Sequence, residues 1–226
     1  IPCISRGPDV VETAEMRQQF GRDVFDYQQL TACLSHLRKP RDRIHKLLAK
    51  GDIVRIRKGL YTFGRMYRRE SLSLEVLANL IHGPSYISLD YALSCHGLIP
   101  ERVSTVTSVA LGRSRQFDTP LGTFTYQSLS LPRYALGADL VESSAGCFLI
   151  ACAEKALADK VWTDKRFSGA SRSDFRPYLE EDLRIDPADL ARLDRSRFQI
   201  IQQAYRSKKI GNLFRFLASL GEPSHA

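Results

Sequence analysis

The sequence predicts an α+β protein in two parts, a basic part over residues 1–68 and a larger, nearly neutral part over residues 69–226. Three patterns support this prediction. Apolar residues at helical spacing and one short β-hairpin occupy the first part, β-branched runs follow Pro100, and helical patterns dominate from Cys147 onward. With 226 residues, the chain is long enough for two small domains that each bury a core.

Charge divides the chain at nearly the same place. Residues 1–70 carry 15 Lys and Arg against 8 Asp and Glu, whereas residues 71–226 carry 18 against 17. The imbalance is steepest between Arg38 and Arg69, with 12 basic residues and 2 acidic ones. Because this charge has one sign and lies on a short segment, it favours a polyanionic partner over general solubility.

Two helices are predicted before the hairpin, with a weaker helical pattern at residues 13–20. The first begins after Asp26, a good N-cap, and its apolar residues recur at helical spacing as far as Leu37. Pro40 suits the first turn of the second helix and Gly51 supplies its end. The apolar stripe of this second helix is Ile44, Leu47 and Leu48.

The hairpin follows directly. Val54 and Ile56 alternate with two arginines, Lys58 and Gly59 form a two-residue turn, and residues 60–63 return as a second strand. Helices followed by a basic hairpin are the order of a winged helix-turn-helix domain, whose last helix enters the DNA major groove while the hairpin lies along the backbone. A single surface charge is more often only solvated, but the whole set is harder to dismiss. The predicted DNA-binding residues are Arg41, Arg43, His45, Lys46, Lys50, Arg55, Arg57 and Lys58.

The second part is predicted to be a mixed α+β domain that is rich in helices at its end. One helix stops at Gly83-Pro84, and a short one runs from an N-cap at Ser88 to Gly97. Three antiparallel strands are expected at residues 103–111, 115–118 and 123–129. Further helices are expected at residues 148–162, 175–183, 187–193 and 196–218, the last with a break near Gly211.

A search for catalytic patterns predicts no enzyme, no cofactor and no metal site. The phosphate-binding, dinucleotide-binding, serine-hydrolase and zinc-protease motifs are absent from the sequence. Cys95 and His96 are adjacent on a helix and so point ~100° apart, which favours a buried cysteine and a capping histidine over a reactive pair. We expect Glu154, Asp159 and the acidic run 180–186 to be solvated helix faces.

Cysteine usage and hydropathy predict a cytoplasmic protein. No run approaches the ~20 apolar residues that cross a bilayer, and the start of the chain is too polar and acidic for a secretory signal. The cysteines are odd in number and form no C-x-x-C pair, which argues against a disulfide framework. Reduced thiols, mostly in the core, are expected at Cys3, Cys33, Cys95, Cys147 and Cys152.

Three stretches resemble the AbiEi antitoxin family. The wing segment is similar in its R-x-G-L-Y arrangement, and residues 83–129 resemble the central segment of the family almost throughout. The stretch AEKALADKVW, residues 153–162, resembles the E-K-A-L helix of the family. The matching residues of the first and third stretches are Arg57, Gly59, Leu60 and Tyr61, then Glu154, Lys155, Ala156 and Leu157. The resemblance covers roughly residues 25–165.

This resemblance implies an antitoxin of a two-gene system that represses its own operon. Its N-terminal winged helix would bind double-stranded DNA at repeats in its own promoter, with cooperative assembly of several copies on DNA as one option. The C-terminal domain would counter a cognate nucleotidyltransferase toxin, directly or indirectly. Two other interpretations stay open from the residues, namely a regulator that senses a ligand or unrelated partner and an enzyme that acts on nucleic acid.

Overall fold

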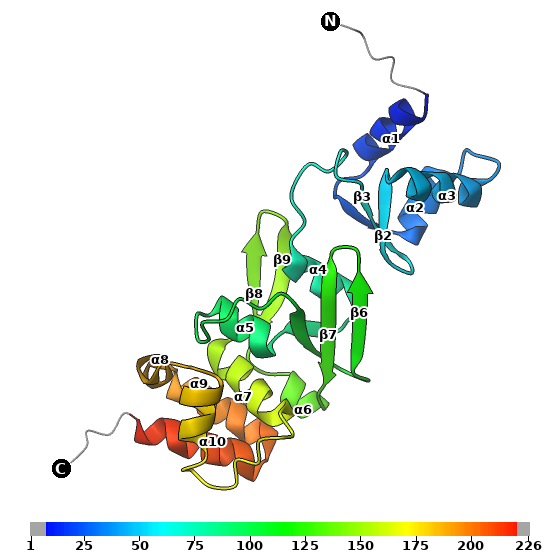
Figure 1. Ribbon diagram of the computed structural model, residues 1–226. Coiled ribbons are helices and arrows are strands. Elements are labelled where there is room, and N and C mark those ends of the chain that lie inside the picture. Colours follow the sequence, from blue (N-terminus) through cyan, green and yellow to red (C-terminus); the bar gives the residue numbers. More distant parts are fainter. Residues whose placement is uncertain (1–7, 221–226) are drawn as a thin grey trace, which may run out of the picture. The chain divides into compact units, whose positions relative to one another are not determined.

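The structure, a computed structural model, describes residues 8–220, with side chains from residue 13 onward. It confirms the predicted mixed α+β composition (Figure 1). The chain divides into two compact units whose main boundary falls between Ser73 and Leu74. We refer to them as the N-terminal unit and the C-terminal unit and describe each by itself.

From residue 8 onward, the N-terminal unit combines three helices with a small antiparallel sheet. Its elements are α1 (Pro8–Gln19), β1 (Val24–Asp26), α2 (Tyr27–Cys33), α3 (Pro40–Lys50), β2 (Ile53–Arg57) and β3 (Leu60–Phe63). The strand order is β1-β3-β2, so β3 is central, and all four of its residues are buried. An aromatic cluster forms the centre of the core, with Phe25 4.8 Å from Phe63 and 4.6 Å from Phe20 between ring centroids.

Helix α2 begins as predicted but ends early. Asp26 accepts a hydrogen bond from Gln29 N (2.7 Å), and the Gln29 side chain accepts one from Asp26 N (2.9 Å), which completes a capping box. The helix ends at Cys33 instead of reaching Leu37. Leu37 N instead bonds Leu34 O (3.0 Å) in a tight turn, which still packs Leu37 against the core.

The hairpin forms with the predicted turn but with a different alternation. A register shift between Arg55 and Arg57 places a β-bulge in β2. Because the bulge shifts the inward and outward alternation of side chains along β2, Ile53 and Ile56 are both buried, while Val54 is only half-buried. The two apolar residues of the predicted alternation therefore differ in burial.

The C-terminal unit is built around a six-stranded mixed sheet with the order β6-β7-β5-β4-β9-β8. Its strands are β4 (Ser85–Ile87), β5 (Val106–Ala110), β6 (Arg115–Thr119), β7 (Gly122–Ser128), β8 (Ala138–Ser143) and β9 (Gly146–Ala151). Its helices are α4 (Leu74–Ile81), α5 (Leu89–Cys95), α6 (Leu131–Tyr134), α7 (Ala153–Thr163), the π-helix η1 (Pro177–Asp182), α8 (Pro187–Arg192), α9 (Arg195–Tyr205) and α10 (Lys208–Ser219).

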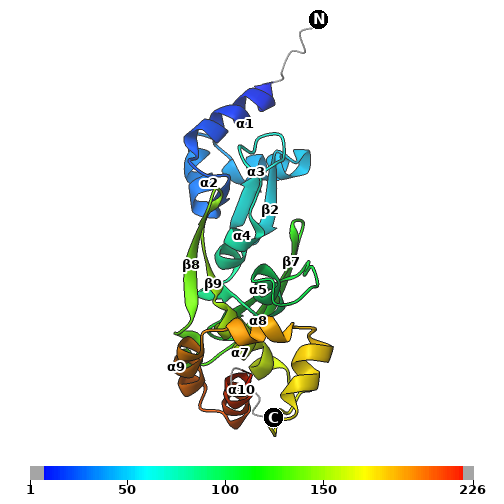
Figure 2. The ribbon, with the colours of Figure 1, turned by 90° about the vertical axis from the view of Figure 1, so that its left-hand side faces the viewer.

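Helices cover both faces of this sheet. Successive residues of a strand point to opposite faces, so Tyr86 and Ile87 of β4 point apart. Ile87 pairs with Ser108 of β5, which pairs with Tyr126 of β7, so Ile87 and Tyr126 point to the same face of the sheet. On that face Tyr126 donates a hydrogen bond to Ala78 O of α4 (2.6 Å). On the other face Tyr86 donates one to Asp159 of α7 (3.2 Å). Thus α4 and α7 lie on opposite faces, and α7, α9 and α10 pack together at one end of the unit (Figure 2).

Several predictions for this unit are wrong. Strands β5 and β7 pair in parallel, not antiparallel. The apolar run before residue 152 is strand β9, and only residues 153–162 of the predicted helix 148–162 belong to α7. The last helical segment breaks at Arg206, which has a left-handed backbone (φ 48°), while Gly211 lies inside α10.

Candidate nucleic-acid interface

Helix α3 carries five of the eight predicted DNA-binding residues, and the local sequence fixes both of its ends. Pro40 occupies the first turn, where its missing N–H leaves no hydrogen bond unmade. Gly51 ends the helix in the left-handed conformation (φ 74°), which a residue without a Cβ adopts at little cost. Ile44 and Leu47 are buried in the core of the N-terminal unit, so the opposite face of α3 is left to solvent.

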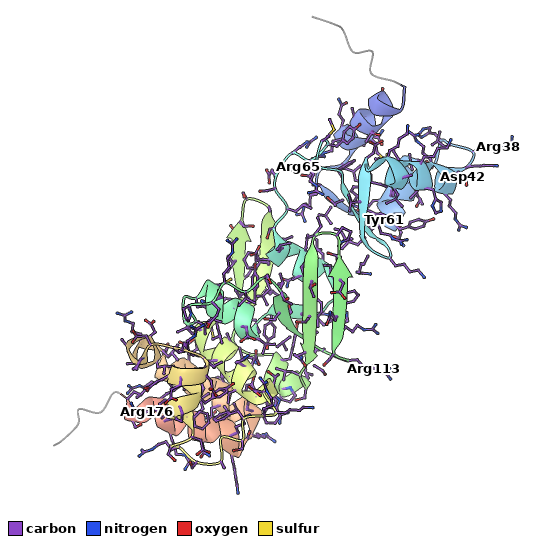
Figure 3. The ribbon with its side chains drawn as sticks, in the orientation of Figure 1. Arg38, Asp42, Tyr61, Arg65, Arg113 and Arg176 are labelled. Carbon is purple, nitrogen blue, oxygen red and sulfur yellow. The ribbon has the colours of Figure 1, made fainter. Side chains whose placement is uncertain are left out.

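The solvent-facing side of α3 is rich in charge. The predicted residues on it that are exposed are Arg41, His45, Lys46 and Lys50, while Arg43 is half-buried. Asp42 is exposed on the same helix, and Figure 3 labels it together with Arg38 from the loop before α3. The face therefore offers several cations and one carboxylate to a partner.

The hairpin β2–β3 presents the other three predicted residues. Arg55 and Lys58 are exposed, whereas Arg57 is half-buried. The Arg57 side chain folds along the turn, where its Nη1 donates to Lys58 O (3.0 Å). Gly59 closes the turn with a positive φ of 86°, and its carbonyl accepts a hydrogen bond from Tyr27 N (3.0 Å). The tip of the hairpin is thus attached to the start of α2.

The structure brings all eight residues onto adjacent elements of one unit. Helix α3 lies against β2, so the cations of the helix and those of the hairpin belong to one contiguous part of the fold. Six of the eight are exposed, and Arg43 and Arg57 are the half-buried exceptions. A cationic surface of this kind can neutralise phosphate groups of a nucleic acid backbone.

Arg17 is a basic residue with a different role, which the sequence patterns did not reveal. Its guanidinium forms an ion pair with Asp23 (2.8 Å), and both side chains are about nine-tenths buried. It also donates to Phe20 O (2.7 Å) and Tyr67 O (3.1 Å) and lies 5.0 Å from the centroid of the Phe63 ring. Arg17 therefore links α1 and the segment at Tyr67 to the core on which α3 packs.

The C-terminal unit contains a buried polar network that sequence reasoning also missed. The Lys155 and Asp159 side chains, one turn apart on α7, are fully buried and form an ion pair. Lys155 Nζ donates to the Tyr205 hydroxyl (2.7 Å), which itself donates to Asp159. The other carboxylate oxygen accepts from Ser88 Oγ (2.7 Å) and Tyr86 Oη (3.2 Å). The network joins β4, α7 and α9 across the core.

Electrostatics in this network follow from burial. Loss of hydration lowers the pKa of Lys155, and the charge of Asp159 opposes that effect. Burial, followed by the charge of Asp159, raises the pKa of Tyr205. The hydroxyl therefore keeps its proton and donates a hydrogen bond to the carboxylate. With four donors around one carboxylate, Asp159 is fully engaged inside the fold, and we interpret the network as structural.

These contacts correct two predictions made from the sequence and refine a third. Asp159 and Glu154 are buried, not solvated. Glu154 accepts a hydrogen bond from Asp194 N (2.8 Å), and so it caps a distant segment. Ser88 lies at the N-cap of α5, as predicted, but its hydroxyl bonds Asp159 instead of capping the helix. The sequence signal for this buried pair is that only the apolar residues Ala156, Leu157 and Ala158 separate Lys155 from Asp159, one helical turn later.

The cysteines differ from the prediction as well. Cys152 is buried, but Cys33 is half-buried and both Cys95 and Cys147 are exposed; Cys3 lies outside the described residues. The prediction of a buried Cys95 is therefore wrong. His96 does occupy the C-cap of α5, and its Nε2 lies 2.7 Å from Ala151 O.

Between residues 8 and 220, no group of three or more His, Cys, Asp or Glu side chains is placed to hold a metal ion. Over the same part of the chain, no helix has the length and apolar character that crossing a bilayer requires.

Comparison with known proteins identifies the fold alone. No family model and no curated protein matches the chain. Among solved structures, it is similar to the crystal structure of the RV2827C protein from Mycobacterium tuberculosis, at 17% sequence identity. The similarity covers 93% of this chain and 76% of that one, with a TM-score of 0.59. The class that these data define is a mixed α+β protein whose fold is similar to that of this solved structure.

Proposed function

We propose that the protein is a DNA-binding transcriptional autorepressor and an antitoxin of the AbiEi kind. In this proposal the N-terminal unit acts as a winged helix-turn-helix domain, with α3 as its recognition helix and β2–β3 as its wing. It acts in the cytoplasm on repeats in its own promoter, without catalysing a reaction. The C-terminal unit counters a cognate nucleotidyltransferase toxin.

The observation that carries the DNA-binding half is the cluster of exposed cations on adjacent elements. Six predicted residues are exposed on α3 and the hairpin, within the segment that holds 12 basic and 2 acidic residues. The order of elements supports the same proposal, because a loop of six residues, 34–39, joins α2 to α3 and a basic hairpin follows α3 directly. Helix α3 would enter the major groove, and Lys58 would contact phosphate beside it.

The DNA-binding half is tested by fluorescence anisotropy with the protein's own promoter and a scrambled duplex at ~150 mM salt. Specific repression requires tighter binding to the promoter. Because each neutralised phosphate contributes ~0.9 to the slope of log K against log salt, Lys58→Ala should flatten the slope by about that amount. Lys165→Ala, which removes an exposed lysine of the C-terminal unit, is the charge-matched control. Equal binding to both duplexes would rule out specific repression, and an unchanged slope would remove Lys58 from the interface.

The antitoxin half rests on the family resemblance of residues 83–129 and 153–162. It is tested by expressing the chain together with the product of the neighbouring gene and scoring growth. Growth in the presence of the toxin supports the proposal, and continued growth arrest contradicts it. A Lys46→Ala/Lys58→Ala chain separates the two halves, because it should lose promoter binding and keep the rescue. A neighbouring gene unrelated to nucleotidyltransferases would favour the sensor interpretation instead.

A further inference from the structure

Asp42 is a carboxylate in the middle of a cationic face. At 100° per residue, Asp42 and Lys46 project opposite the buried stripe of Ile44 and Leu47, at the centre of the solvent-facing side of α3. The Asp42 side chain is 65% exposed, and its contact with Lys39 spans 4.0 Å between two exposed groups. A pair of this kind restrains neither side chain strongly.

The second carboxylate of the basic segment has a different environment. Asp52 is half-buried and accepts a hydrogen bond from Thr13 Oγ1 (3.2 Å), while its backbone carbonyl accepts from Gly64 N (2.7 Å). Asp52 therefore has a place in the folded core. Asp42 is the acidic residue of residues 38–69 that projects from the proposed recognition helix.

Phosphate binding does not account for this carboxylate. A negative charge on a surface that faces a polyanion is repelled by it, so Asp42 weakens binding to every sequence equally unless it makes a specific contact. It also lies in the first turn of α3, where an acid stabilises the helix dipole. That second role concerns stability and has no dependence on the sequence of the DNA.

Base chemistry offers a role that is specific. A carboxylate can only accept hydrogen bonds, and in the major groove only cytosine N4 and adenine N6 donate them. Adenine places the acceptor N7 beside its donor, which repels a carboxylate, whereas cytosine has a C–H group there. Residues in the N-terminal part of a recognition helix are those that reach base edges, and Asp42 is the third residue of α3.

We infer that Asp42 accepts a hydrogen bond from N4 of a cytosine in the major groove and so specifies a C·G pair at one position of each promoter repeat. This inference rests on the proposed DNA-binding function and extends it by naming one base and its reader. The surrounding cations hold the helix at the backbone, and Asp42 selects the register. Asp42 weakens binding to all DNA sequences, but less to those that offer the cytosine, and so it makes the protein discriminate between sequences.

The first test compares base preferences by selection from promoter duplexes in which every position is varied. The wild-type chain should prefer C·G at one position by about tenfold. Asp42→Asn should lose that preference or exchange it for A·T, because an amide pairs well with adenine, and should keep the others. Glu70→Gln removes one exposed negative charge from the same unit and should leave all preferences unchanged. Asp42→Ser repeats the test with a different neutral side chain in case the asparagine chain folds poorly.

The second test changes the DNA instead of the protein, so the wild-type result does not depend on how a variant folds. Replacing the specified cytosine by 2-pyrimidinone removes only the amino group, and the wild-type chain should lose about tenfold in affinity. Asp42→Asn should lose much less on the same duplex. Equal losses for both chains, or no loss for the wild type, would overturn the inference while promoter binding stands. If the wild type prefers no sequence at all, both the inference and the proposed DNA-binding function fail.

Discussion

Removal of one partner from the buried Lys155–Asp159 pair should destabilise the C-terminal unit strongly. Both side chains are fully buried, and the Asp159 carboxylate is the common acceptor for Lys155, Tyr205, Ser88 and Tyr86. Lys155→Met leaves a buried carboxylate with hydroxyl donors alone, and Asp159→Asn leaves a buried ammonium without its counter-charge. Each single change should lower the free energy of unfolding by about 3–5 kcal/mol.

The double change separates pairing from packing. Lys155→Met with Asp159→Asn removes both charges, so it should cost clearly less than the sum of the two single changes, with a coupling of about 2–3 kcal/mol. Urea unfolding followed by the fluorescence of Trp162, the single tryptophan, reports on this unit. Lys160→Met on the same helix is the control, because its 2.6 Å ion pair with Asp90 is partly exposed and should contribute less than about 1 kcal/mol. Single changes below about 1 kcal/mol, or strict additivity, would show that the network does not act as a unit.

Three further expectations concern backbone crowding, pH and thiol accessibility. A Cβ at Gly64 would lie 1.9 Å from Gly51 O, so Gly64→Ala should cost about 3 kcal/mol or more by thermal melting, whereas Gly21→Ala, with nothing within 4 Å, should be nearly neutral. Burial raises the pKa of the Cys152 thiol to about 12. A free thiol ionises near ~8.5, so the unfolded chain loses this proton first. The free energy of unfolding should therefore fall as the pH rises between these values, less steeply in Cys152→Ser, and a parallel fall in that variant would contradict the assignment. Iodoacetamide should modify exposed Cys147 in the folded chain but Cys152 only in urea, as mass spectrometry can show.

The elements of the candidate interface were predictable because their signals are local. Pro40, the apolar stripe and Gly51 define α3 by steric and conformational rules that act within the helix itself. The turn at Gly59 likewise defines the hairpin. The bulge in β2 was not predictable, since it is set by how the strand meets the core of the folded unit.

The C-terminal unit was harder to predict because its organisation depends on distant partners. The run that forms β9 is short and apolar, a pattern that fits either a strand or a buried helix. Strand β8 is largely exposed on both faces and so carries no alternation of apolar and polar residues. The burial of Asp159 depends on hydroxyls from Ser88 and Tyr205, which are far away in the sequence.

The hydrogen bond from Tyr27 N to Gly59 O has a consequence for how such a protein could diversify. It joins two backbone groups, so any side chain except proline at position 27 can preserve it. The tip can therefore exchange Lys58 for another residue without loosening its attachment. In the proposed complex with DNA, the tip is already ordered by this bond and would lose little chain entropy on association. Substitutions at position 58 would thus change the strength of the proposed phosphate contact, while the backbone that holds the tip stays the same.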